Sequence, residues 1–424
     1  MTEVVAAPAL RTQGERTEIK RLMVFFALVY FTEGVAQDEG LIAQPLNYYL
    51  KQVFQWTPVQ IAVFLSVLYL PWIIKPLYGI VSDFIPLFGL RRKNYLIVAN
   101  LISAGAYFFI ARSSLPASLI FLMLLTAYGM AIASTVCGAI LVENGQKLDA
   151  NAVFVNQQWL WFNIATLVTS IMGGVLIEWL TPISAVHAAA AIAGSTSVLV
   201  IVGTLFLIDE EKSAISVEGF KESFASLVAA LKERRLWVLA GFLFFYYFSP
   251  GIDTPLYFYM TDTLKFSQQY IGVLGSIQAA GAIAAALFYG MFLTNLSAKA
   301  LLNLSILIGV IALLGFLFLF DPVSAALIRF IYGVSDMMAT LAPFAIAADL
   351  CPKRSEGFSF AALIAITNLS GLLADNVGAY LFEHSFKNEL YPLILVAAAF
   401  TAAIFLFVPL LKLKPEEHAL LVPQ

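Results

Sequence analysis

Twelve apolar runs, each long enough to cross a lipid bilayer, dominate this sequence. A membrane-spanning α-helix needs about 20 consecutive residues that are mostly apolar. The chain is 61% hydrophobic and only 12% charged, so it lacks the charged residues that a water-soluble surface requires. The sequence therefore predicts an all-α integral membrane protein with twelve transmembrane helices. The predicted spans are 22–50, 58–82, 94–112, 117–141, 155–179, 186–208, 236–260, 268–293, 299–319, 323–349, 357–383 and 390–411.

One long polar interruption, residues 209–235, divides the predicted spans into six and six. Its middle part, 217–231, carries apolar residues at helical spacing. That spacing is typical of a helix lying on the membrane surface, and equally of a plain amphipathic linker. The predicted organisation is a cytoplasmic tail, a six-helix bundle, a cytoplasmic linker, a second six-helix bundle and a second tail, at 1–21, 22–208, 209–235, 236–412 and 413–424.

The distribution of lysine and arginine predicts how the chain crosses the membrane. If the N-terminus is cytoplasmic, 18 of the 24 basic residues fall in cytoplasmic segments and 4 fall on the other side. Cytoplasmic loops are enriched in positive charge, so we expect both termini in the cytoplasm and the protein in the inner or plasma membrane of the cell. The first twenty residues are polar and charged, without the apolar core of a cleavable signal peptide.

The two halves of the sequence resemble each other at an offset of 210 residues. Residues 43–63 align with 253–273, so that Pro45 meets Pro255. Secondary transporters are often built from such repeats, with the solute cavity between them near the middle of the bilayer. We therefore expect two pseudo-symmetric bundles around a central cavity.

Two basic residues, Lys75 and Arg329, lie inside predicted spans of opposite halves. A charge at the centre of a membrane helix costs about 2.5–3.5 kcal/mol on insertion scales, so each one needs a partner or a watery cavity. Together they predict a site for an anionic solute, because arginine binds a carboxylate through two parallel hydrogen bonds and lysine acts as a point charge. The alternative is an internal ion pair, such as one between Arg329 and Asp336, which lies seven residues further on.

Other polar or aromatic side chains complete the predicted binding set. Asp253 lies in the seventh span, and Tyr257 belongs to a group of aromatic residues that either stack on a flat heterocycle or face lipid. Pro250 and Gly251 should break this helix, and such breaks line cavities or gates. Asn156 in the fifth span either lines the cavity or makes hydrogen bonds between helices. The predicted substrate-binding residues are Lys75, Arg329, Asp336, Asp253, Asn156 and Tyr257.

Two carboxyl groups in the first span predict that transport is coupled to protons. Glu33 lies about 11 residues into the span, roughly 16 Å at 1.5 Å per residue, which is near mid-membrane. A carboxyl group held away from water can take up and release a proton. Glu33 is the first candidate for the proton-coupling group and Asp38 the second. The alternative is that both pair with Lys75 or Arg329 and hold helices together.

A basic turn joins the second and third spans. After Gly79 and Asp83 the chain turns and reaches Arg91-Arg92-Lys93, where a new apolar run begins. We expect Asp83 to pair with this cluster and with the N-terminal end of a helix from the other half. The predicted role of Gly79, Asp83, Arg91 and Arg92 is a gating latch that holds the cytoplasmic side shut.

This Gly-x-x-x-Asp step with its Arg/Lys cluster resembles the loop between helices 2 and 3 of the major facilitator superfamily of transporters. Its longer form, with Lys-Pro-Leu-Tyr-Gly before the aspartate and Ile-Pro-Leu-Phe-Gly after it, is similar to the folate-biopterin transporter (BT1) family. A second match lies at 350–363, with Leu-Cys-Pro, Glu-Gly and Phe-Ala-Ala-Leu. In the fourth span Val142-Glu143 matches the family, but the upstream positions, where the family usually carries acidic residues, read Ser134, Cys137 and Gly138.

The resemblance implies a monomeric secondary transporter with the major facilitator superfamily fold. It implies further that the chain moves a folate- or pterin-like anion with protons, by alternating access. One alternative is a transporter of a different solute, such as a drug, a sugar or an amino-acid-like molecule. Another is a receptor or assembly factor that has the fold without transport activity.

The sequence predicts neither an enzyme nor a metal site, a cofactor or a nucleic-acid partner. The chain has 2 cysteines, Cys137 and Cys351, no Cys-x-x-Cys pattern, and 3 histidines at span ends or in the tail. A nucleophile with a matching base and a glycine-rich phosphate loop are both missing from the sequence, which disfavours a membrane enzyme. The expected partners are the lipid bilayer, a small-molecule solute and protons.

Overall fold

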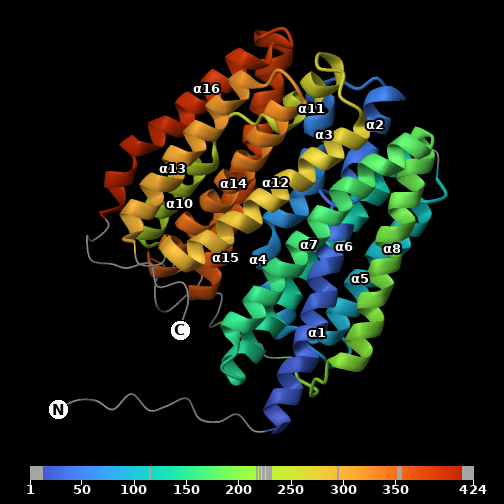
Figure 1. Cartoon of the computed structure of the whole chain (residues 1–424). Coiled ribbons are helices and arrows are strands. Elements are labelled where there is room, and N and C mark those ends of the chain that lie inside the picture. Colours follow the sequence, from blue (N-terminus) through green and yellow to red (C-terminus); the bar gives the residue numbers. More distant parts are fainter. Residues whose placement is uncertain are drawn as a thin grey trace.

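The computed structural model describes residues 13–113, 116–215, 232–293, 296–350 and 356–412, together with Glu218, Lys221 and Ala225. Within these residues the chain is almost entirely helical, and the long helices run side by side in two groups (Figure 1). Several features predicted above lie outside the described residues, namely most of the linker segment 217–231, Cys351, and the tail residues 1–12 and 413–424.

The helices of the first half are α1 (Gln13–Ala36), α2 (Ala43–Gln52), α3 (Pro58–Ile73), α4 (Lys75–Phe84), α5 (Lys93–Ile110), α6 (Pro116–Lys147), α7 (Asn151–Trp179) and α8 (Pro182–Leu207). Those of the second half are α10 (Arg234–Tyr247), α11 (Asp253–Asp262), α12 (Gln268–Phe288), α13 (Ala298–Gly315), α14 (Pro322–Leu350), α15 (Glu356–Tyr380) and α16 (Leu390–Ala403). Short π- or 3₁₀-helical turns continue four of them: η1 (Tyr289–Leu293), η2 (Phe316–Phe318), η3 (Leu381–Ser385), η4 (Ile404–Leu406) and η5 (Val408–Leu411).

The helices agree with the predicted spans. In the described part of the chain, 10 helical segments are long and apolar enough to cross a membrane, and each coincides with a predicted span. The other two predicted spans, 22–50 and 236–260, are each split into two helices, α1 with α2 and α10 with α11. The structure is therefore consistent with twelve crossings.

The split in the first span corrects the prediction of one continuous helix over 22–50. The N–H of Leu41 donates to the carbonyl oxygen of Val35 at 2.9 Å, which closes a tight turn. A Cβ atom on Gly40 would overlap that same carbonyl group, so the turn needs glycine there. The split in the seventh span falls at Pro250 and Gly251 and confirms the break predicted there.

The internal repeat is confirmed in the fold. The helices α2 and α11 each have 10 residues, and their first residues, Ala43 and Asp253, are 210 positions apart. The helices α3 and α12 each begin after a hydroxyl N-cap, Thr57 and Ser267, whose oxygen accepts a main-chain N–H three residues on. The chain follows one local path twice, so the two bundles are pseudo-symmetric.

Each half has hydrophobic clusters of its own, and the most extensive contacts between the halves are made by two helix pairs. The large buried clusters are built from residues 19–208 in the first half and 236–411 in the second. The helix α7 packs on α12, and α3 packs on α15. Gly174 lets α7 approach α12, because a Cβ atom there would lie 2.7 Å from the carbonyl oxygen of Gln268.

The two halves are tied together at one end of the bundle, here called the distal end, where α2, α11 and the starts of α3 and α12 lie (Figure 1). The opposite end, where α1 begins, is called the near end. At the distal end Gln44 donates to the main-chain carbonyl of Gln268 at 2.7 Å. Lys51 forms an ion pair with Asp262 at 2.6 Å and also donates to Thr261. The structure is therefore a state in which the distal end is closed.

Candidate functional site

A cavity of about 740 Å³ lies between the two halves, beside the breaks in the first and seventh spans. Pockets that hold small organic molecules have volumes of about 300–1,000 Å³. Residues of α2 and α3 line it from the first half, and residues of α10 to α16 and η4 line it from the second. Non-helical backbone at membrane depth is tolerated where it faces such a cavity, which explains why both breaks lie here.

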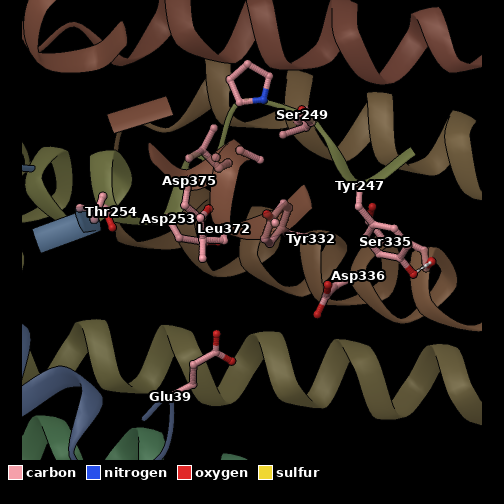
Figure 2. Close-up of a pocket in the computed structure, with 18 of the residues that line it drawn as sticks. Glu39, Tyr247, Ser249, Asp253, Thr254, Tyr332, Ser335, Asp336, Leu372 and Asp375 are labelled. Carbon is pink, nitrogen blue, oxygen red and sulfur yellow. Dashed lines mark hydrogen bonds between the residues drawn. The ribbon is translucent and has the colours of Figure 1, made fainter. Parts of the chain in front are cut away.

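Five carboxyl groups of the described residues line the cavity. Two come from the break between α1 and α2, and three come from α11, α14 and α15. Figure 2 shows Glu39 on one side and Asp253, Asp336 and Asp375 on the other. Asp38, the second proton-coupling candidate, is 6% exposed and also belongs to the lining. This acidic lining favours protons, cations and solutes that present N–H donors. The five are Asp38, Glu39, Asp253, Asp336 and Asp375.

Arg329 on α14 brings a positive charge to this acidic cavity. Its side chain is 15% exposed, and its Nη1 atom lies 3.7 Å from the nearer carboxyl oxygen of Asp253. Its Nε and Nη1 atoms are buried without a hydrogen-bond partner among the described residues. Arg329 therefore pairs loosely with Asp253 rather than with Asp336, and two of its guanidinium nitrogens form no hydrogen bond with the described residues.

Tyrosine rings stand beside the carboxyl groups. Tyr69 on α3 donates a hydrogen bond to Glu39. Tyr257 lines the cavity and donates to the side chain of Gln268 at 3.2 Å. Tyr332 also belongs to the lining, and Figure 2 shows it between Asp253 and Asp336. The cavity thus offers flat aromatic surfaces next to hydrogen-bond acceptors.

Two glycines fix the break of the seventh span against α15. The N–H of Gly251 donates to the carbonyl oxygen of Ala374 at 2.8 Å. A Cβ atom on Gly378 would overlap the backbone of Gly251, and a Cβ atom on Gly251 would overlap Asp375. This close approach holds the carboxyl group of Asp375 beside the break and so places it in the cavity.

Comparisons with known proteins agree with this architecture. The sequence model of the BT1 family matches residues 33–418, which is most of the chain. The chain belongs to the BT1 family. The folate-biopterin transporter of Synechocystis sp. is 27% identical over 368 residues, which cover 83% of this chain and 73% of that protein. Folate transporter 2 of Plasmodium falciparum is 26% identical over 427 residues, which cover 93% of this chain and 89% of that protein.

The fold of this BT1-family chain is shared with solved transporters. A crystal structure of a mutant of the nucleoside transporter NupG matches it with a TM-score of 0.72 at 16% identity, covering 92% of this chain and 99% of the other. The predicted major facilitator superfamily fold is confirmed. The family and these relatives are transporters rather than enzymes, so the chain is a secondary transporter that works in a membrane.

A second polar site of the BT1-family chain lies inside its first half. The hydroxyl group of Ser134 on α6 donates to Oε1 of Glu33 at 2.7 Å, and Nζ of Lys75 donates to the same hydroxyl at 3.0 Å. Lys75 also lies 4.6 Å from the ring centroid of Trp72. Neither Lys75 nor Glu33 is among the described residues that line the cavity. The structure therefore brings Lys75 to Glu33 and not to Arg329, because α4 directs it toward α1 and α6.

Asn156 is not brought into the cavity. The helix α7 contributes no described residue to the lining, and Asn156 is exposed. The neighbouring polar side chains bond within α7, since Trp161 donates to Gln157 at 2.9 Å and Asn163 donates to the carbonyl of Trp159 at 2.7 Å. The geometry does not support Asn156 as a cavity residue, because α7 faces α12 while α2 and α3 wall the cavity.

The basic turn of the BT1-family chain forms a charge network at the near end. Arg92 is 7% exposed, donates to Ser82 at 2.7 Å and to Glu143 at 2.6 Å, and pairs with Asp83. Burial alone would lower the pKa of the Arg92 guanidinium, but the hydrogen bonds and charges of Glu143 and Asp83 raise that pKa above its usual value. The side chain of Glu210 accepts three successive main-chain N–H groups where α5 begins.

The four predicted gating residues differ in how they contact this network. Asp83 and Arg92 are paired as expected. Arg91 contributes its main-chain N–H to Glu210 at 2.8 Å, and a Cβ atom on Gly79 would meet only the side chain of Thr135, at 3.9 Å. These partners lie in the first half, except for Glu210 at the start of the linker. A latch to the second half belongs to a state closed at the near end, and it stays a prediction.

Part of the cavity lining is not among the residues predicted from the sequence. Glu39 and Asp375 line it but are not among the predicted site residues. Both are charged residues inside long apolar runs, which is the same signal that selects Lys75 and Arg329. Tyr69 carries no comparable signal, because tyrosine is common in membrane helices and only the packing decides which ring faces a cavity.

Proposed function

We propose that this BT1-family transporter moves a folate- or pterin-like anion across the inner or plasma membrane of the cell by alternating access, coupled to protons. The observation that carries the proposal is one cavity whose lining combines the guanidinium of Arg329 with several carboxyl groups. The names of two relatives, a folate-biopterin transporter and a folate transporter, support this class of solute.

The chemistry of a folate matches both kinds of group. Its carboxylates would bind Arg329 through parallel hydrogen bonds. Its pterin ring presents an amino group and ring N–H donors on a flat heterocycle, which the carboxyl groups of Asp253 and Asp336 would accept. The ring of Tyr257 offers a surface against which that heterocycle would lie. An acidic cavity with one guanidinium therefore suits a solute that is anionic at one end and rich in N–H donors at the other.

We propose residues 22–208 and 236–412 as the two moving bodies, with 209–235 as the cytoplasmic linker and both termini in the cytoplasm. The distribution of basic residues along the sequence supports this orientation. In it the distal end faces outward, and the described state is closed to the outside. We propose a monomer as the working unit, with the cavity formed between the two halves of one chain.

Proton coupling would rest on Glu33 and Asp38. Glu33 is 8% exposed, and its Oε2 atom has no hydrogen-bond partner among the described residues. Protonation of Glu33 would remove the negative charge that Lys75 faces through Ser134. The two protonation states would then favour different packings of α1, α4 and α6, which is what coupling requires. Asp38 lies in the cavity itself, where solute and proton would meet.

Proteoliposomes test this function directly. We expect labelled folate or a pterin to accumulate when a pH gradient is imposed, and to exchange when it is not. Binding of folate without any flux would support a receptor instead. Flux of a sugar, drug or amino acid that folates do not compete with would support a transporter of another solute.

A further inference from the structure

Two glutamates at the distal end each contact the start of a helix in the opposite half. Glu383 in η3, which continues α15, accepts the main-chain N–H of Val59 on α3 at 3.0 Å. Glu178 near the end of α7 accepts the main-chain N–H of Gln269 on α12 at 3.3 Å. Both hydrogen bonds therefore join one bundle to the other.

The internal repeat relates these two contacts. Val59 and Gln269 are 210 positions apart, and each is the second residue of its helix. In each helix the following main-chain N–H donates to the hydroxyl of the helix's own N-cap. Gln60 donates to Thr57 at 3.4 Å, and Tyr270 donates to Ser267 at 3.1 Å. The first N–H groups of a helix have no partner inside it. One of them is satisfied by the helix's own cap, and its neighbour by a carboxylate from the other half.

The two contacts stabilise the conformation that is closed at the distal end, as well as the starts of α3 and α12. A helix start carries about half a positive charge, which favours a carboxylate placed against it. When the halves separate at the distal end, each glutamate leaves its helix start, and the N–H group is left to water. Because one contact joins α3 to the end of α15 and the other joins α12 to α7, both oppose the same opening from two places.

We propose that Glu178 and Glu383 are gating residues that form a duplicated distal latch and set the balance between the distal-closed and distal-open states of the transporter. The two carboxylates act on pseudo-symmetric helix starts, so each contributes to the same conformational equilibrium. The latch requires no particular solute, and its test is independent of the proposed solute class.

A cysteine reporter in the closed interface measures opening. Ser276 on α12 is 7% exposed and donates to the carbonyl oxygen of Leu167 on α7 at 2.7 Å, so Ser276→Cys places a thiol inside the contact between the halves. The full-length protein is purified in detergent with both native cysteines replaced by alanine. The rate at which a maleimide alkylates the reporter then follows the distal-open population.

The variants are Glu178→Gln, Glu383→Gln and the two combined, because glutamine keeps the size of the side chain and removes its charge. Each single variant should raise the alkylation rate about two- to five-fold, because that is the change in the conformational equilibrium expected when one charge is removed from a helix end. The combined variant should raise it by about the product of the two, since independent contributions to one equilibrium multiply. Glu389→Gln removes an exposed distal carboxylate and should leave the rate unchanged.

Two further variants separate the latch from local effects. Thr57→Ala removes the cap that α3 makes for itself and should not change the rate. Val59→Pro removes the N–H that Glu383 accepts, and proline is tolerated in the first turn of a helix. It should raise the rate as Glu383→Gln does, and no further when the two are combined.

An unchanged rate in the combined variant, in protein that unfolds at the same temperature as the parent, would overturn the proposal. An equal rise with Thr57→Ala would also overturn it, because fraying of α3 would then explain the effect. If the glutamine variants do not fold, Val59→Pro alone tests the proposal. An unchanged alkylation rate in that variant excludes a latch role for Glu383.

Discussion

The side-chain amide of Asn368 on α15 donates a hydrogen bond of 3.2 Å to the main-chain carbonyl oxygen of Trp72 on α3. That oxygen is available because the residue four positions later, Pro76, has no N–H to offer it. The helix breaks at the same point, between α3 and α4. A contact between the halves therefore lies at the break between α3 and α4, three residues before Lys75.

Asn368→Ala should lower the free energy of unfolding by about 1–3 kcal/mol, because it leaves the carbonyl oxygen of Trp72 without a donor. Pro76→Ala should restore the hydrogen bond inside the helix, so that Asn368→Ala then costs little. Denaturant unfolding of the two single variants and the double variant in detergent measures this coupling. Equal costs of Asn368→Ala in both backgrounds would contradict the role assigned to Pro76.

Gly378→Ala should destabilise the fold by about 1–3 kcal/mol, since the added methyl group has no room against the backbone of Gly251. Gly371→Ala on the same helix is the matched control. A Cβ atom there meets nothing within 4 Å, and alanine favours the helix by up to about 1 kcal/mol. Unfolding midpoints compare the two. Similar midpoints would show that the close approach of α15 to the seventh span is not needed.

Arg329→Lys should weaken binding of folate about ten- to hundred-fold and leave a neutral pterin bound as before, because lysine cannot replace the two parallel hydrogen bonds of a guanidinium. Lys75→Gln should leave both affinities nearly unchanged, since Lys75 faces Ser134 and Glu33 instead of the cavity. Equilibrium binding to the purified protein tests both. Equal losses for folate and the neutral pterin would indicate that Arg329 supports the fold.

Glu33→Gln should abolish uptake driven by a pH gradient and preserve exchange of solute across the membrane, because the side chain can no longer release a proton. Ser134→Ala removes the bridge to Lys75 but keeps both charges, so it should reduce gradient-driven uptake without abolishing it. The measured quantity is the ratio of gradient-driven uptake to exchange in proteoliposomes. Full gradient-driven uptake by Glu33→Gln would exclude Glu33 as the coupling group.

Arg92→Met should lower the free energy of unfolding by about 1–3 kcal/mol, because Asp83 and Glu143 lose a charged donor. The pKa of Arg92 is raised in the folded protein. The stabilising effect of Arg92 is therefore complete below the pKa that arginine has in the unfolded chain, and is lost only above the raised pKa of the folded protein. Unfolding at pH 7 and pH 10 should show the same cost. A cost that disappears by pH 10 would mean that the charge of Arg92 does not hold the network.

The break at Gly40 could have been predicted, and the reason lies in the repeat. With the offset of 210, Gly40 and Leu41 correspond to Pro250 and Gly251, where the sequence already predicts a broken helix. The break in the first span is harder to predict, because Gly40 has no proline beside it. The repeat shows where the turn must lie, and the overlap of a Cβ atom on Gly40 with the carbonyl group of Val35 shows why only glycine serves there.

The sequence by itself determined the membrane class, the two related halves, the break at Pro250 and the family, because these depend on hydrophobic length and on chemistry between near neighbours in the chain. Only the tertiary structure decided which charges share a cavity. In the sequence Lys75 and Arg329 look alike, because each is a cation within an apolar run. The rotation of each helix against partners distant in sequence turns Arg329 to the cavity and Lys75 to Ser134 and Glu33. Spacing along one helix cannot report that rotation, because it says nothing of the neighbour that the helix packs against.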